Sequence, residues 1–332
     1  MAGIDHLEAE AFSALGAVPI VWIDLADADA HRRARALRRD TRAIVGGIDA
    51  AGLLPPVDEA GFDLLLSAHS DPPRPWVGSP DTAQAVRSIS DAVARAPIAA
   101  GVAARLLHMG EHLAFADGIE LESLAYSTLL GSATFRTWRA ARDAGPTRDD
   151  KGPYLRVARE DDAVTITLAR PATRNGMSAG MRDALHESLC AVLDDPSLPR
   201  LVLRGDGGCF STGGVPGEFG TATDLAMAHA VRTLRSCALR LHELGERARV
   251  ELHGACIGSG IEIPAAAALR HALPGAFFQL PELAMGLIPG AGGTVTLPRA
   301  IGRHRACWMM LSGRRISARI AADWGLVTPR AP

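Results

Sequence analysis

Apolar and polar positions in the first part of the chain predict a small unit of strands and helices. Short apolar runs at residues 18–24 and 62–67 are typical of strands. The polar stretch 27–48 between them carries arginines at helical spacing and predicts a helix whose basic side chains face solvent. From residue 79 the pattern stays helical to 142. Breaks in these helices are expected at Pro97, Asp117-Gly118 and Gly131-Ser132.

The second part of the chain alternates between strand and helix patterns. Strands are predicted at residues 154–158, 163–168, 201–204 and 250–252. Helices are predicted at residues 178–193, 222–244 and 259–269. Ser178 is a suitable N-cap for the first of these helices. Such alternation indicates an α/β unit with mostly parallel strands.

A sharp change in composition separates the two parts. Residues 145–153 contain two prolines, two glycines and four charged residues, which predicts a linker. The chain therefore divides into about 1–145 and 152–332.

Composition and charge exclude several classes of protein. The 35 basic and 37 acidic residues give a net charge of −2, so no overall field favours nucleic acid or an anionic membrane. The apolar stretch 14–23 contains Pro19 and is too short to span a bilayer, and no basic segment precedes it as in a signal peptide. Five cysteines without a CxxC pair predict free thiols in a reducing compartment, and we expect a cytoplasmic protein.

Glycine-rich stretches carry the candidate chemistry. The run 258–260 opens a predicted helix, where unpaired N–H groups can bind an anionic oxygen. Glu262 lies one turn further on in apolar surroundings, where an unpaired carboxylate costs several kcal/mol, so a functional acid is favoured over a satisfied structural one. Glu282 follows Pro281 and fits a functional acid and a simple first-turn acid equally well.

Other motifs of catalysis are missing from the sequence. There is no GxxxxGK[ST] phosphate loop and no GxGxxG fingerprint among these glycines. Ser259 does not stand in a GxSxG nucleophile elbow, and no HExxH pair is present. We therefore expect neither a serine hydrolase nor a catalytic metal.

Five segments in order resemble the motifs of the crotonase (enoyl-CoA hydratase/isomerase) superfamily, over about residues 152–330. They are LARPATRNGMS at 168–178, FSTGG at 210–214, HGACIGSGIE at 253–262, PELAMGLIPGAGGT at 281–294, and LSGRRISA with ADWGLV at 311–327. The resemblance implies an α/β crotonase-like core, a spiral of (ββα) repeats, with an N-terminal, mainly helical domain. It further implies an acyl-CoA thioester substrate, a role in fatty acid metabolism, no other cofactor, and a homo-oligomer, a trimer or hexamer.

The resemblance also assigns roles to residues. Glu262 and Glu282 would be the catalytic acids, and the backbone N–H groups of Gly214 and Ser259 would form the oxyanion hole. Residues expected to contact the substrate or its CoA are Arg174, Asn175, Thr212, Gly213, Gly258, Pro289 and Gly290. With both acids present, hydration of a 2-enoyl-CoA is the expected reaction. Alternatives are a Δ-isomerase, another enolate reaction on a biosynthetic CoA ester, and, ranked lower, a cofactor-free oxygenase.

Three departures from the family pattern keep a different class open. Ser259 replaces a glycine, Val215 replaces the common Asp, and His253 stands where Asn is usual. Because of these changes, a protein of a different functional class stays open as an alternative: a catalytically inactive CoA-ester-binding or assembly subunit.

The order of segments differs from that of the family. Relatives continue past the GLV motif with a helical segment, whereas this sequence ends five residues after Val327. Residues 80–142 resemble that segment, notably LESLAYSTLLGS at 121–132, which implies a circular permutation. We therefore expect three regions: a β-α-β-like extension of unknown role at 1–79, a helical domain at 80–145, and a crotonase-like catalytic core at 152–332.

Overall fold

The computed structural model describes residues 6–142 and 152–329, so the predicted linker lies almost entirely outside the described residues. Its first unit is a parallel four-stranded sheet in the order β1-β2-β3-β4. The strands are β1 (Ile20–Asp24), β2 (Ile44–Asp49), β3 (Leu64–Ser67) and β4 (Val77–Gly78). The accompanying helices are α1 (His6–Ala9) and α2 (Ala30–Asp40).

The predicted helix at 27–48 is wrong beyond Asp40, because the chain turns extended at Thr41 and forms β2. The two glycines of this strand interrupt the apolar pattern by which a strand is predicted from the sequence. A Cβ at Gly46 would lie 2.4 Å from the ring of Trp22, so the strand needs glycine where the ring covers it. Alternate side chains of β3 serve two cores: Leu65 packs with α2, whereas Leu64 and Leu66 join the main core.

Four helices follow the sheet. They are α3 (Thr82–Arg95), α4 (Pro97–Met109), α5 (Phe115–Leu130) and α6 (Ala133–Ala140). The breaks predicted at Pro97 and Gly131-Ser132 are confirmed. The break predicted at Asp117-Gly118 is wrong, because Gly118 lies inside α5, and the chain turns at Gly110–His112 instead. Gly118 faces Val295, where a Cβ would come within 3.0 Å of that side chain.

The second part of the chain contains a six-stranded sheet in the order β13-β10-β8-β7-β6-β5, parallel except for the β5–β6 pair. Its strands are β5 (Leu155–Glu160), β6 (Ala163–Leu168), β7 (Arg200–Gly205), β8 (Ala248–Leu252), β10 (Leu269–Ala272) and β13 (Thr328–Pro329). A smaller sheet contains β9 (Ala255–Ile257), β11 (Phe277–Gln279) and β12 (Ile316–Ser317).

Helices surround these sheets. They are α7 (Ala179–Leu193), α8 (Leu225–Leu234), α9 (Cys237–Glu243), α10 (Ser259–Glu262), α11 (Gly293–Ile301), α12 (Arg303–Ser312) and α13 (Ala318–Asp323). Ser178 caps α7 by accepting from the Met181 N–H at 3.2 Å, as predicted. The helix predicted at 222–244 is two helices, because the chain leaves helical geometry at Arg235 and Ser236 caps α9.

The apolar helix predicted at 259–269 is also too long. It ends after Glu262, since Pro264 cannot continue the regular hydrogen bonding and starts a 3-10 turn that leads into β10. Glu262 is thus the last residue of a one-turn helix, which holds its carboxylate at the helix end.

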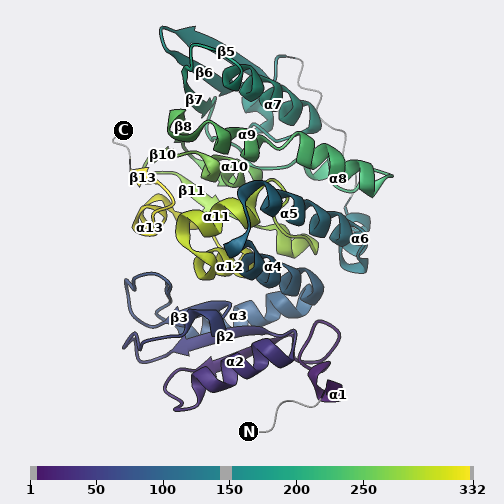
Figure 1. Ribbon diagram of the computed structural model, residues 1–332, viewed down its shortest axis with the longest axis vertical. Helices are drawn as coiled ribbons and strands as arrows, with labels where there is room; N and C mark the ends of the chain where they lie inside the picture. Colours follow the sequence, from purple (N-terminus) through teal and green to yellow (C-terminus); the bar gives the residue numbers. More distant parts are fainter. Residues whose placement is uncertain (1–5, 143–151, 330–332) are drawn as a thin grey trace.

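The elements stack along the long axis of the molecule. Figure 1 places the purple N-terminal sheet at one end and β5–β7 at the other, with α3, α4 and α12 between them. Arg305 of α12 donates to the carbonyls of Trp76 and Pro72, both at 3.0 Å, so the core is bonded directly to the N-terminal unit. Helix α5 lies beside α8 and α11, where the main cavity opens. No helix in the described ranges is both long and apolar enough to cross a membrane.

Candidate active site

A cavity of about 770 Å³ lies where α5, α7, α8 and α10 meet the loop before α11. Of the residues predicted from the sequence, five line it: Gly214, Ser259, Glu262, Glu282 and Gly290. These come from three separate motifs, which the fold brings to one place. The cavity also receives residues from α5, the helix of the N-terminal part.

Glu262 is buried and is held by the backbone. Its Oε2 accepts hydrogen bonds from the N–H groups of Ala291 (2.7 Å) and Gly293 (3.1 Å). A Cβ at Gly293 would lie 3.0 Å from the same oxygen, so this approach needs glycine. Burial raises the pKa of Glu262 to about 7, and the backbone hydrogen bonds oppose the shift. The carboxylate is therefore fixed in place and can exchange a proton near neutral pH.

Glu282 faces Glu262 across Gly258. A Cβ added to Gly258 would lie 2.7 Å from Oε1 of Glu282 and 3.7 Å from Oε1 of Glu262, so the two carboxylates flank the same point. Oε2 of Glu282 is shielded from solvent and has no hydrogen-bond partner among the described residues. Burial, and then the charge of Glu262, hold the pKa of Glu282 well above its ordinary value.

A third buried carboxylate, Glu122 of α5, was not predicted as a site residue. Its Oε1 accepts from the Gly292 N–H at 2.7 Å, and its Oε2 accepts from the N–H and hydroxyl of Thr294 at 2.8 and 2.7 Å. Burial and the charge of Glu262 raise the pKa of Glu122 to about 8. Glu262 and Glu122 thus share the consecutive N–H groups of residues 291–294, at the start of α11.

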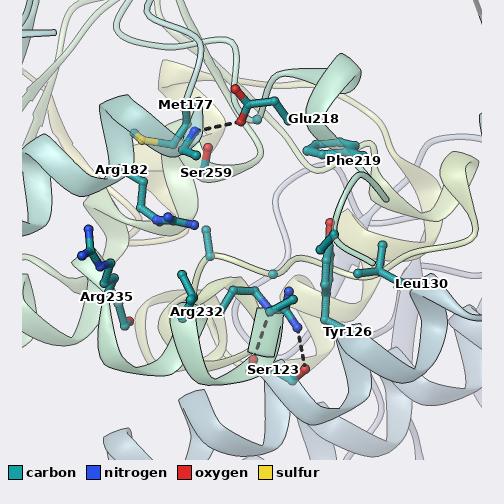
Figure 2. A pocket seen from close by; sticks show the side chains of 18 of the residues that line it. Ser123, Tyr126, Leu130, Met177, Arg182, Glu218, Phe219, Arg232, Arg235 and Ser259 are labelled. Carbon is teal, nitrogen blue, oxygen red and sulfur yellow. Dashed lines mark hydrogen bonds between the residues drawn. The ribbon is translucent and has the colours of Figure 1, made fainter. Parts of the chain in front are cut away.

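The two N–H groups predicted to form an oxyanion hole have no backbone acceptor among the described residues, and their role stays a prediction. Ser259 is the first residue of α10, so its N–H has no acceptor within the helix. In the part of the chain that the structure describes, the N–H of Gly214 makes no backbone hydrogen bond either. The Ser259 hydroxyl is buried at the cavity wall and has no hydrogen-bond partner among the residues that the structure describes; Figure 2 shows Ser259 and Met177 at this cavity.

Other residues predicted to contact the substrate lie around the cavity but do not line it. The side chain of Asn175 is already engaged by the protein backbone. Its side chain is fully buried and binds the backbone of Arg170, Asp206, Cys209 and Phe210, so it has no free group for a substrate. It fixes the loop between β7 and the FSTGG segment.

The remaining predicted residues shape the backbone or stand outside the cavity wall. Gly213 has φ +84°, and a Cβ there would lie 2.5 Å from the Ile257 carbonyl oxygen. Arg174 is exposed, and its carbonyl accepts from the Thr212 N–H at 3.1 Å. Pro289 is buried, and its ring would touch a Cβ at Gly293. Contacts of Arg174, Thr212, Gly213, Gly258 and Pro289 with a substrate stay predictions.

Three arginines form a second wall of the cavity that sequence reasoning did not single out. Arg182 of α7 binds Asp183 at 2.7–2.8 Å, and Arg235 binds the same carboxylate at 2.9 Å. Arg232 of α8 donates to Ser123 instead. Figure 2 shows Arg182 and Arg232 bordering the same space as Tyr126 and Leu130 of α5. The cavity therefore has an acidic wall, formed by Glu122, Glu262 and Glu282, and a basic wall, formed by Arg182, Arg232 and Arg235.

The fold and this site, with buried glutamates beside two unpaired N–H groups, define a crotonase-like enzyme. A family model, enoyl-CoA hydratase/isomerase, matches residues 159–332, and the chain belongs to this family. It is 33% identical over 178 residues to the 2,3-dehydroadipyl-CoA hydratase of Escherichia coli, covering 54% of this chain and 69% of the relative. It is 32% identical over 174 residues to the putative enoyl-CoA hydratase/isomerase YngF of Bacillus subtilis, covering 52% and 67%.

A solved structure bears out the fold. The enoyl-CoA hydratase from Bacillus halodurans superposes with a TM-score of 0.50 at 25% identity, over 53% of this chain and 72% of that one. The predicted crotonase-like fold class is confirmed, and the protein is an enzyme of the enoyl-CoA hydratase/isomerase kind.

Proposed function

We propose that this enzyme hydrates a 2-enoyl-CoA by stabilising the enolate of the thioester. The observation that carries the proposal is the placement of Glu262 and Glu282 on either side of Gly258, in the cavity that also contains Gly214 and Ser259. Two acids facing one point can hold a water molecule between them. Two unpaired N–H groups can hold the thioester oxygen as it becomes negative.

In this mechanism the two glutamates have different tasks. Glu262 takes a proton from water, whose oxygen attacks Cβ, and electrons of the double bond move onto the thioester oxygen. The N–H groups of Gly214 and Ser259 stabilise that oxygen, each by about 3 kcal/mol in the transition state. Glu282 then delivers a proton to Cα. Its raised pKa suits a group that begins protonated, and the pKa of about 7 suits Glu262 as the base.

Isomerisation of a 3-enoyl-CoA is the second candidate. One observation favours it: within the described ranges, Oε2 of Glu282 has no hydrogen-bond partner, whereas Glu262 accepts two backbone hydrogen bonds. A single carboxyl group that is not held by hydrogen bonds at this oxygen could then carry a proton between two carbons. A relative of 31% identity from Mycosarcoma maydis is named an isomerase/hydratase, so both reactions suit the family.

The test is a panel of CoA esters followed by mass spectrometry. A gain of the mass of water from crotonyl-CoA and longer 2-enoyl-CoA esters supports hydration. A 3-enoyl-CoA that becomes a 2-enoyl-CoA without a change in mass supports isomerisation. Binding of esters without turnover of any would favour the inactive binding subunit.

We also propose that α3–α6 take the place of the helical segment with which relatives end. The support is that Glu122, Tyr126 and Leu130 of α5 line the cavity, and that the matched structure has a remainder which this chain does not cover in sequence order. Deleting 1–79 while keeping 80–332 would test which part the cavity needs. A trimeric or hexameric assembly, a cytoplasmic location and independence from added cofactors belong to the same proposal.

A further inference from the structure

Arg232 brings a positive charge to the cavity, and none of the described residues forms an ion pair with it. Its Nε donates to Ser123 Oγ at 3.1 Å, and its Nη2 donates to the Ser127 hydroxyl and to the Ser123 carbonyl. Nη1 has no hydrogen-bond partner among the described residues. Arg182 and Arg235 both bind Asp183, so Arg232 alone of the three is held by neutral oxygens. An arginine stays charged, and a charge without a counterion in a half-enclosed cavity favours an anionic ligand.

The nearest acid of α5 does not neutralise Arg232. Glu122 turns both carboxylate oxygens toward residues 292 and 294, where they accept three hydrogen bonds. Its pKa of about 8 leaves it largely protonated at neutral pH. The electrostatic attraction it exerts on Arg232 is outweighed by burial, which lowers the pKa of that guanidinium.

Arg232 is connected to the catalytic glutamates by one aromatic ring. Its Cζ lies 5.0 Å from the centre of the Tyr126 ring. On its other side, the Tyr126 ring lies against Gly290, where a Cβ would come within 2.5 Å of it. Gly290 directly precedes the backbone amides that bind Glu262. A chain bound at the glutamates could therefore extend past Tyr126 and end at Arg232 (Figure 2).

We propose that Arg232 binds a carboxylate at the far end of the acyl chain, so that the preferred substrates are CoA esters of unsaturated dicarboxylic acids. Nη1 would donate the hydrogen bonds that the described residues leave unused. The inference rests on the proposed function, because it assumes that the acyl group reacts between Glu262 and Glu282. A phosphate of CoA carries the same anionic oxygens, so the experiment must separate the two sources.

The first measurement compares 2-enoyl-CoA esters of equal chain length that end in a methyl group or in a carboxylate. A charge-assisted hydrogen bond in a partly enclosed site should raise kcat/KM for the acidic ester by roughly 10- to 100-fold over the neutral one. Equal values for the two esters, or a preference for the neutral one, would overturn the proposal.

The second measurement changes the arginines. Arg232→Met should bring the ratio of kcat/KM values, acidic over neutral, close to 1, and Arg232→Lys should restore part of it. Arg235→Met is the matched control, since it removes the same charge from a guanidinium already paired with Asp183, and should change the ratio by less than about threefold. Because the ratio compares two substrates on one variant, a general loss of folded protein cancels. An unchanged ratio in Arg232→Met would refute the assignment.

The third measurement removes the phosphates. N-acetylcysteamine thioesters keep the acyl group and the thioester but lack every phosphate of CoA. The preference for the acidic acyl group, and its loss in Arg232→Met, should persist with them. If Arg232→Met weakens all CoA esters equally and the thioesters show no preference, Arg232 binds a CoA phosphate and the proposal fails.

Calorimetry keeps the test independent of turnover. If no ester is hydrated or isomerised, the proposed function fails, but saturated esters still report on binding. Affinity at least about tenfold higher for the acidic ester, lost in Arg232→Met, would support the carboxylate site, whereas equal affinities would overturn it.

Discussion

The two walls of the cavity hold their charges in different ways. The carboxylates of Glu122 and Glu262 are buried and bonded to backbone N–H groups of the loop before α11. On the basic wall, Arg182 and Arg235 are part-exposed and bound to the side chain of Asp183. Backbone contacts depend on the path of the chain, whereas side-chain pairs can change one residue at a time. The path of the backbone therefore fixes the two carboxylates of the acidic wall more firmly than a side-chain pair fixes Arg182 and Arg235.

The largest effect is expected from Glu282→Gln on the acidic wall. The variant keeps the shape of the side chain but cannot deliver a proton, so kcat should fall by roughly 10²- to 10⁴-fold while the CoA ester still binds. Stability should change little, because Oε2 of Glu282 has no partner to lose among the described residues. Steady-state kinetics on the best ester of the panel gives the answer. Glu246→Gln, on an exposed 3-10 turn, is the control, and a kcat within tenfold of the unaltered enzyme would refute the role of Glu282.

Glu122→Ala should show how strongly the acidic wall supports the fold. The change leaves the N–H groups of Gly292 and Thr294 buried without an acceptor, which should lower the free energy of unfolding by about 3 kcal/mol. Urea denaturation measures this difference. Glu120→Ala on the same helix removes a half-exposed carboxylate that pairs with His229, its one ion pair in the described part of the chain, and should cost under about 1 kcal/mol. Equal losses in the two variants would mean that Glu122 does not stabilise the loop.

The glutamates of the acidic wall should also make the stability of the protein depend on pH. The folded-state pKa values of Glu122 (about 8) and Glu262 (about 7) lie above the ordinary 4.5, so in this range the folded protein holds protons that the unfolded chain has released. The free energy of unfolding should therefore fall by roughly 1–2 kcal/mol per pH unit between pH 6.5 and 8.

The measurement is best made above pH 6.5, because a buried histidine contributes to the pH dependence of stability at lower pH. Burial lowers the pKa of His304 to about 3, so around and below its ordinary value of 6.5 the unfolded chain takes up a proton that the folded chain refuses, and this offsets part of the fall that the glutamates cause. The offset fades as the pH rises above 6.5, so urea unfolding at several higher pH values reports mainly on the glutamates. A stability that is flat or rising from 6.5 to 8 would contradict the raised pKa values.

The smallest effect is expected on the basic wall. Asp183→Ala removes the shared partner of Arg182 and Arg235, yet all three side chains are about a third exposed, so water replaces the lost contacts. The free energy of unfolding should drop by less than about 1 kcal/mol in urea denaturation. A loss as large as that of Glu122→Ala would erase the contrast between the two walls.

The sequence predicts the acidic wall well where a motif names its residues. Glu262 and Glu282 stand in segments rich in glycine, and the structure brings them together at the cavity. The sequence does not identify Glu122 as a site residue, because an acid in a helix looks like a solvent-facing residue until the packing of α5 on α11 is known. For the same reason Arg232 is not singled out: only the tertiary contacts show that no acid among the described residues pairs with it.

Secondary structure was predicted least well where tertiary contacts override the local pattern. Strand β2 contains Gly46 because Trp22 covers that position, so its composition does not look like a strand. The helix after Ser259 was overextended because its alanines favour helix, while Pro264 and the start of β10 end it. Local propensity cannot report either constraint.

The hydrogen bond from Gly292 to Glu122 joins residues 170 positions apart in the chain. On the ribosome, α5 is made long before the loop that binds its glutamate, and the described part of the intervening chain contains seven strands, β5 to β11. Contacts of such sequence separation form late, because closing a long loop loses entropy before any contact compensates. During refolding, helix content should therefore recover first, and affinity for a CoA ester should return only when the two distant segments meet.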